Sequence, residues 1–237
     1  MNPYEKLLNR KRKWTPVQTT AGTCKEGAEE AIFRALALRH MELPVGDFIT
    51  DALSSDVPNN ARDILLSNVK DEENHDLALG YIANAYGVDQ TAEAEALRLK
   101  AAWEAHPDHT ITKALVAERA IFFVLLPFFR FNGDAGMRTV SADISRDEQI
   151  HVATNSLVHT ELGYNISPSL DKLRKATINW VMQPLGDHAD KYLNKKFWLD
   201  SSDRLMYEGK APQLAETKAA RMPAFFEHSN VNLPQYA

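Results

Sequence analysis

The sequence contains one arrangement of glutamate and histidine twice. In each copy, a lone glutamate precedes a Glu-x-x-His pair by thirty residues. The two copies consist of Glu42, Glu72 and His75, and of Glu118, Glu148 and His151. Residues three positions apart lie on one face of a helix, so each pair directs a carboxylate and an imidazole to the same point. Four carboxylates and two imidazoles on four helices are the ligand set of a carboxylate-bridged dinuclear metal site.

These six residues lie on helical stripes that are otherwise apolar. Glu72 and His75, for example, share a stripe with Leu65, Leu79 and Ile82. A buried carboxylate without a partner is costly or stays protonated. The stripes therefore predict two compensating metal ions, bridged by the glutamates of the two Glu-x-x-His pairs. Oxygen and imidazole ligands together favour iron or manganese over calcium.

The first ligand has alternatives on the same predicted helix. Glu42 is preferred because it reproduces the thirty-residue spacing and shares a stripe with Ile32 and Ile49. Glu29 and Glu30 are the other candidates. Solvated acids near a helix N-terminus are the second interpretation of these two residues, because negative charge is stabilised there.

Helical periodicity recurs along the chain, whereas strand signals are scarce. We expect a single all-α domain built on a four-helix bundle. Pro44 should kink the first helix, because proline removes a hydrogen bond and crowds the preceding turn. The core helices are predicted at about 25–53, 61–86, 110–131 and 137–162, with a connecting helix at about 91–104. Additional C-terminal helices are predicted at about 169–195 and on to about 220, followed by a tail at about 222–237.

Charge and composition exclude several classes of protein. The 237 residues carry a net charge of −5, so we expect no nucleic-acid partner. The basic run Arg10–Lys13 is the local exception, and it is interpreted as a solvated face or as a docking contact. Cys24 is the single cysteine, which leaves no disulfide or thiolate cluster. The longest apolar run, Ala120–Phe129, contains Pro127 and is too short to span a membrane, so we expect a soluble protein. The single cysteine fits a reducing compartment, and we expect a cytoplasmic location.

Three segments resemble the radical-generating (beta) subunit of class I ribonucleotide reductase. The strongest likeness is in Ala117–Phe123 and in Ser145–His151, where the string Arg-Asp-Glu-x-x-His is the most family-specific part. Val57–Arg62, leading to the first Glu-x-x-His pair, is similar to the corresponding earlier stretch. Only forty-six residues separate Glu72 from Glu118, so the chain looks like a pared-down, phage-type version.

The resemblance implies a ferritin-like fold and an oxidised dimetal cofactor. In that family the cofactor supplies a radical equivalent to a separate catalytic (alpha) subunit, which makes deoxyribonucleotides. It further implies a homodimer that binds the catalytic subunit through its C-terminal tail. A phage-encoded version would work in the host cytoplasm.

The resemblance also implies a route for radical transfer. His75 would contact Asp147, and Asp147 would contact Trp14, because Trp14-Thr15-Pro16 is similar to the family's Trp-x-Pro. Tyr236 would then relay to the partner, with Tyr207 as its rival. Other interpretations stay open: an acid that only orients the imidazole, a packing tryptophan, and a tyrosine that anchors a docking tail.

One departure from the family concerns the radical tyrosine. The family places it four residues after the first ligand histidine, where this chain has Leu79. Tyr81 is close in sequence but points away from the Glu72 face. This departure, together with glutamate at position 42, is similar to relatives that store the equivalent on manganese and iron. We therefore expect Mn/Fe, then Mn/Mn, then Fe/Fe.

Two rival functions share the predicted fold. The first is an oxygenase that acts on its own small apolar substrate, with a channel lined by Phe122, Phe123, Phe128 and Phe129. Core packing is the competing interpretation of these phenylalanines. The second rival is a ferritin-like metal-storage protein, which would form a large cage rather than the expected homodimer.

Overall fold

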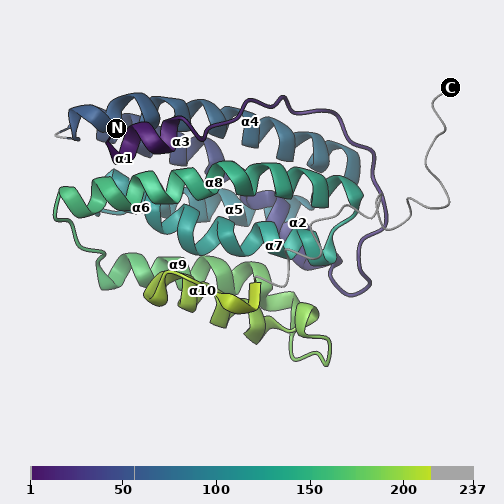
Figure 1. Cartoon of the computed structure of the whole chain (residues 1–237). Helices are drawn as coiled ribbons and strands as arrows, with labels where there is room; N and C mark the ends of the chain where they lie inside the picture. The colour runs from purple at the N-terminus through teal and green to yellow at the C-terminus, as the bar shows by residue number, and fades with distance from the viewer. Residues whose placement is uncertain (1, 56, 215–237) are drawn as a thin grey trace, which may run out of the picture.

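The computed structural model describes residues 2–55 and 57–214. Every regular element in these ranges is a helix, and the long helices lie side by side along one axis (Figure 1). Four arms form the central bundle: α2 (Glu29–Ala37) with α3 (Glu42–Leu53), α4 (Arg62–Tyr86), α6 (Thr110–Ala117) with α7 (Phe123–Asn132), and α8 (Ala135–Glu161). This architecture confirms the predicted all-α bundle.

Four further helices cover the bundle. The short helix α1 (Pro3–Leu8), which the sequence patterns did not predict, packs on α4 and α8. Helix α5 (Gln90–Glu104) crosses beside α2, in agreement with the predicted connecting helix. Helices α9 (Pro168–Met182) and α10 (Lys195–Glu208) pack together on the opposite side from α1 (Figure 1).

The first arm is two helices rather than the single helix predicted at about 25–53. It begins at Glu29, and a 3-10 turn at Leu38–Met41 separates α2 from α3. Pro44 lies in the first turn of α3, where the backbone N–H groups of a helix have no intrahelical partner. The break therefore falls just before the proline and leaves Glu42 as the first residue of α3.

The third arm contains a π-helical turn that the periodicity did not predict. It spans Glu118–Phe122 and separates α6 from α7, so the predicted helix at about 110–131 is interrupted. A π-helical turn inserts extra backbone into a helix and often occurs at functional sites. Here it begins at Glu118, whose side chain is fully buried.

The inner stripes of α4 and α8 are apolar towards both ends and polar in the middle. On α4, Leu65 and Ile82 flank the buried Glu72 and His75. On α8, Ile144 and Val158 flank the buried second pair in the same way. The bundle thus buries apolar side chains above and below one polar layer, which holds the candidate site.

The C-terminal part differs from the prediction at two helix ends. Helix α10 ends at Glu208, before Gly209, rather than near residue 220. Helix α9 ends at Met182 rather than near residue 195, because a 3-10 turn containing Pro184 follows it. Gly186, with φ of 62°, then turns the chain in a conformation that favours glycine. Residues 215–237, with the predicted tail and Tyr236, lie outside the described residues. None of the described helices is both long and apolar enough to cross a membrane.

Candidate metal centre

The structure brings the six repeated glutamates and histidines together at the centre of the bundle. None of their side chains is more than 1% exposed. Their ligand atoms form two groups in which all atoms lie within 4.8 Å of one another. The first group contains Glu42, Glu72, His75 and Glu148, and the second contains Glu72, Glu118 and His151. The two groups share Glu72, which gives the geometry of two adjacent cation sites.

The alternative first ligands lie elsewhere. Glu29 and Glu30 are exposed. Glu30 pairs with Arg34 at 2.8 Å, and Glu29 accepts a hydrogen bond from the Gly27 amide. Both fit the interpretation of solvated acids near a helix N-terminus, and Glu42 is the glutamate of the first arm that faces the site.

The histidines face the carboxylates with the same ring nitrogen. His75 Nδ1 lies 3.3 Å from Glu72 Oε2, 3.3 Å from Glu148 Oε1 and 3.6 Å from Glu42 Oε2. The ring of His151 is 5.6 Å from that of His75, measured between centroids. Its Nδ1 atom has three carboxylate neighbours: Glu72 Oε1 at 3.0 Å, Glu118 Oε1 at 3.7 Å and Glu148 Oε1 at 3.7 Å.

Glu72 and Glu148 occupy the positions that bridging ligands require. The two oxygens of Glu72 face different histidines, and a single oxygen of Glu148 faces both. Glu118 belongs to one side only, where its second oxygen accepts a 2.6 Å hydrogen bond from Asn155. Carboxylates shared in this way can hold two cations at once.

The donor atoms fit a pair of metal ions. Each of the six residues has at least one buried oxygen or nitrogen without a hydrogen-bond partner among the described residues. Buried polar atoms are normally satisfied, so such a concentration at one point requires an explanation. Two divalent cations would satisfy these atoms together: Glu42 Oε2, both Glu72 oxygens, His75 Nδ1, Glu118 Oε1, both Glu148 oxygens and His151 Nδ1.

Without cations, the site compensates its charge with protons. Burial raises the pKa of Glu42 to about 8 and also raises the pKa values of Glu118 and Glu148. Burial alone would lower the pKa of His151, but the facing carboxylates outweigh it and raise this pKa to about 10. Burial opposes ionisation of Glu72 as well, yet the two imidazoles lower its pKa. Metal binding would therefore release protons from this site, because metal ligands must be deprotonated.

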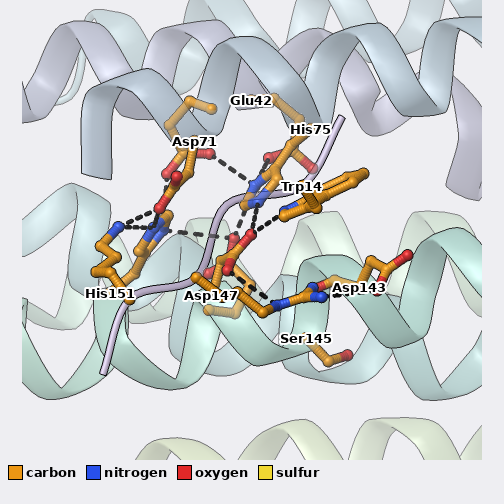
Figure 2. A network of polar contacts seen from close by, with 12 residues as sticks. Trp14, Glu42, Asp71, His75, Asp143, Ser145, Asp147 and His151 are labelled. Atoms are coloured by element: carbon orange, nitrogen blue, oxygen red, sulfur yellow. Dashed lines mark hydrogen bonds and ion pairs between the residues drawn. The ribbon is translucent and has the colours of Figure 1, made fainter. Parts of the chain in front are cut away.

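The outward side of His75 leads to the protein surface through two residues. His75 Nε2 lies 3.4 Å from Asp147 Oδ2, and Trp14 donates its indole N–H to the same oxygen at 2.6 Å. Figure 2 shows the three side chains in series, with Trp14 at the outer end. The Arg12 guanidinium lies 3.7 Å from the other Asp147 oxygen. The predicted series of His75, Asp147 and Trp14 is therefore contiguous in space.

The outward side of His151 has an aspartate that the sequence reasoning missed. Asp71 Oδ2 lies 3.0 Å from His151 Nε2, and Asp71 also pairs with Lys11 (Figure 2). A signal was available, because an aspartate immediately precedes the glutamate of both Glu-x-x-His pairs. Each aspartate contacts the histidine of the other copy, so the contact depends on how α4 and α8 face each other.

The tyrosines expected to matter lie away from these residues. Among the described residues, no tyrosine forms a hydrogen bond or ring contact with any of the six side chains, and position 79 is a buried leucine. Tyr207 is 60% exposed on α10 and donates a hydrogen bond to Asp171, which fits a surface role. Tyr236 cannot be placed, so its assignment stays a prediction.

With this geometry established, comparison with known proteins identifies the fold. The chain is similar to the crystal structure, at 1.90 Å resolution, of a candidate class I ribonucleotide reductase from Bacillus halodurans. The TM-score is 0.56 at 15% sequence identity, covering 95% of this chain and 97% of that chain. The two proteins share a fold. No family model matches this sequence, and no curated protein does so either. The resemblance found in the sequence is thus confirmed for the fold, and the buried glutamates and histidines can hold a dinuclear site.

Proposed function

We propose that this chain is the beta subunit of a ribonucleoside-diphosphate reductase. In this proposal it assembles an oxidised dimetal cofactor and supplies a radical equivalent to a catalytic alpha subunit. The observation that carries the proposal is the hydrogen bond from Trp14 to Asp147, which itself reaches His75. An oxidisable side chain that leads outward from the site favours transfer to a partner protein over use on a bound substrate.

The residues around the site have distinct tasks in this proposal. When bound, a metal pair held by the six ligands would supply the oxidising power, after reaction with oxygen or a reduced oxygen species. Asp147 accepts hydrogen bonds from His75 and Trp14 through one oxygen, Oδ2. It therefore orients the imidazole, and it can hold the indole proton when Trp14 gives up an electron. The buried bundle core keeps water away from the ligands.

The proposed metal pair comes from the family resemblance, together with the absence of the radical tyrosine. Leu79 occupies the position of the family's radical tyrosine, and no described tyrosine contacts the site. We therefore propose that the oxidising equivalent is stored without a tyrosyl radical. Manganese with iron is the favoured pair, followed by two manganese ions and then two iron ions.

The partners in this proposal are a second copy of the chain and a catalytic subunit. The homodimer comes from the family resemblance, as does binding of the catalytic subunit through the C-terminal tail. Tyr236 is the proposed tail relay. Replacing Tyr236 by phenylalanine should stop nucleotide reduction if the relay assignment holds, and unchanged turnover would exclude it.

The central experiment combines metal loading with spectroscopy and turnover. The protein is given Mn(II) and Fe(II), exposed to oxygen, and examined by EPR and metal quantitation. We expect two metals per chain, no tyrosyl doublet, and reduction of nucleoside diphosphates only when the catalytic subunit is added. Failure to bind two metals would exclude the site, and a sharp tyrosyl signal would exclude storage on the metals.

The rival oxygenase has less support in the structure. Phe122, Phe128 and Phe129 belong to the hydrophobic core, and Phe128 packs edge-on against Trp198 at 5.3 Å between ring centroids. These side chains therefore serve packing rather than lining a channel. Turnover of an apolar substrate without any partner protein would support the oxygenase function instead. A cage-sized particle in solution would favour metal storage.

A further inference from the structure

The basic run Arg10–Lys13 divides into two pairs with different surroundings. Lys11 and Arg12 turn inward and pair with aspartates, since Lys11 contacts Asp71 and Arg12 reaches Asp143 at 3.0 Å. Arg10 and Lys13 are exposed, and neither forms an ion pair among the residues that the structure describes. Only the inner half of the run is therefore neutralised by the protein itself.

A surface cavity lies where this segment crosses α4. Its volume is about 550 Å³, and its lining includes Lys13, Trp14, Lys70, Asp71 and Asn74. Lys70 is exposed on α4 and, like Lys13, has no ion-pair partner among residues 2–55 and 57–214. Figure 1 shows the segment after α1 running along the outside of the bundle at this place. The cavity thus combines two free lysines with the outer end of the Trp14–Asp147–His75 series.

We propose that this cavity docks an acidic segment of the partner protein that receives the oxidising equivalent leaving the site through Trp14. The inference rests on the proposed function and adds where, and by what chemistry, the partner binds. The chain as a whole carries a net charge of −5, so a local cluster of uncompensated lysines is a distinct positive feature. A patch of this kind steers an acidic partner into register and accelerates its association.

The arrangement of charges favours a protein over a small phosphate compound. Among the basic residues that line the cavity, the two least exposed are Lys11 and Arg12. They already form ion pairs with Asp71 and Asp143. The free ammonium groups are those of Lys13 and Lys70, which are exposed. Exposed lysines of this kind attract an acidic protein from a distance, but they do not enclose a single phosphate group.

The charge balance also argues against the chain's own C-terminal segment as the occupant. Residues 215–237 contain two acidic and two basic side chains, namely Glu216, Lys218, Arg221 and Glu227. Such a segment carries no net negative charge to complement the lysines. An acidic segment of another protein complements the lysines better than residues 215–237 do.

The test measures association of the catalytic subunit with three forms of the metal-loaded protein over a range of salt concentrations. The forms are the unaltered chain, the double variant Lys13→Glu/Lys70→Glu, and the control Lys172→Glu/Lys210→Glu. The control makes the same change in charge at exposed lysines on α9 and just after α10, on the opposite side of the bundle. We expect the association rate constant of the first variant to fall about tenfold and to lose its salt dependence. The control should match the unaltered chain.

Other outcomes separate this inference from the proposed function. If the unaltered chain binds the catalytic subunit and the Lys13/Lys70 variant binds it equally fast, the docking inference is wrong while the proposed function stands. If the unaltered chain does not bind the catalytic subunit, both fail. Metal content and circular dichroism of the variants must equal those of the unaltered chain. A shift of the Trp14 indole N–H resonance on adding millimolar inorganic phosphate, lost in the variant, would instead identify a small-anion site and overturn the inference.

Discussion

His75 and His151 face the same carboxylates through Nδ1, but their outward sides differ. Both Nε2 atoms meet an aspartate, at 3.4 Å for Asp147 and at 3.0 Å for Asp71. An aspartate at this position holds the imidazole in one tautomer and orientation, so that Nδ1 keeps its lone pair for a metal ion. The two halves of the site are therefore alike in how they hold their histidines.

The residues beyond the aspartates make the halves unequal. Asp147 continues to the Trp14 indole, whereas Asp71 continues to the Lys11 ammonium. An indole can be oxidised and pass an electron onward, but an ammonium group cannot. In the proposed function, the Trp14 side of the site therefore carries the oxidising equivalent, whereas the Lys11 side only neutralises charge. The ligands thus define the site, and the residues beyond the aspartates distinguish its two sides.

We expect the strongest loss of metal binding from a change at Glu148, which, like Glu72, faces both histidines. Replacing Glu148 by glutamine removes a charged oxygen that faces both histidines, so we expect binding of both metals to be lost. Metal quantitation after gel filtration measures this. Glu42→Gln, which touches one half only, should retain one metal. Glu73→Gln, an exposed change on α4, is the matched control, and two tightly bound metals in Glu148→Gln would show that the halves do not share this ligand.

The second prediction tests whether only the Trp14 side carries the oxidising equivalent. Trp14→Phe should lower nucleotide reduction on the order of a hundredfold, because the electron-transfer step loses its indole. Lys11→Met should keep turnover within about threefold of the unaltered chain. Trp180→Phe is the control, because Trp180 also donates to a carboxylate, at 2.6 Å, far from the site. If the Trp14 and Lys11 variants bind both metals and lose nucleotide reduction equally, the proposed difference between the two sides is wrong.

The third prediction tests what the two halves have in common. Asp71→Asn and Asp147→Asn should each weaken metal affinity about 10–100-fold, because each leaves a ligand histidine without its orienting carboxylate. Competition with a chelator measures the affinity. Asp143→Asn is the control, since Asp143 pairs with Arg12 rather than with a histidine. If Asp71→Asn alone has no effect, then Asp71 serves Lys11 and not His151.

The smallest expected effect is a pH dependence of stability in the metal-free protein. Glu42 has a folded pKa of about 8 against an ordinary value of 4.5, and His151 about 10 against 6.5. Both groups therefore bind more protons in the folded state across pH 6.5 to 8, and stability falls as pH rises through this window. Each extra proton contributes a slope of up to about 1.4 kcal/mol per pH unit.

Thermal unfolding of the chelated and the metal-loaded protein measures this dependence. The chelated form should lose several degrees of Tm between those pH values. The loaded form should not, because metal ions replace the protons. A Tm of the chelated form that rises with pH would mean that the carboxylates are already ionised without metals.

Much of the fold and the ligand layer was predictable, because helical periodicity is local. Leu65, Glu72 and His75 lie on one face of α4 wherever that helix packs. A buried carboxylate on such a face requires a cation, so the ligand chemistry could be read from the residues alone. The π-helical turn at Glu118 and the end of α9 at Met182 were not predicted, since competing packing and turn geometries decide them.

The spacing of residues along the chain was enough to predict which residue types share a helical face, and with them the candidate ligands and the all-α class. Only the tertiary structure decided which aspartate meets which histidine, and that Trp14 rather than Lys11 lies at the outer end of the Asp147 contact. Contacts of this kind join residues more than seventy positions apart. They depend on how α4, α8 and the N-terminal segment pack, and no local periodicity contains that information. Helix formation follows short-range spacing, whereas the contacts beyond the ligands follow long-range packing.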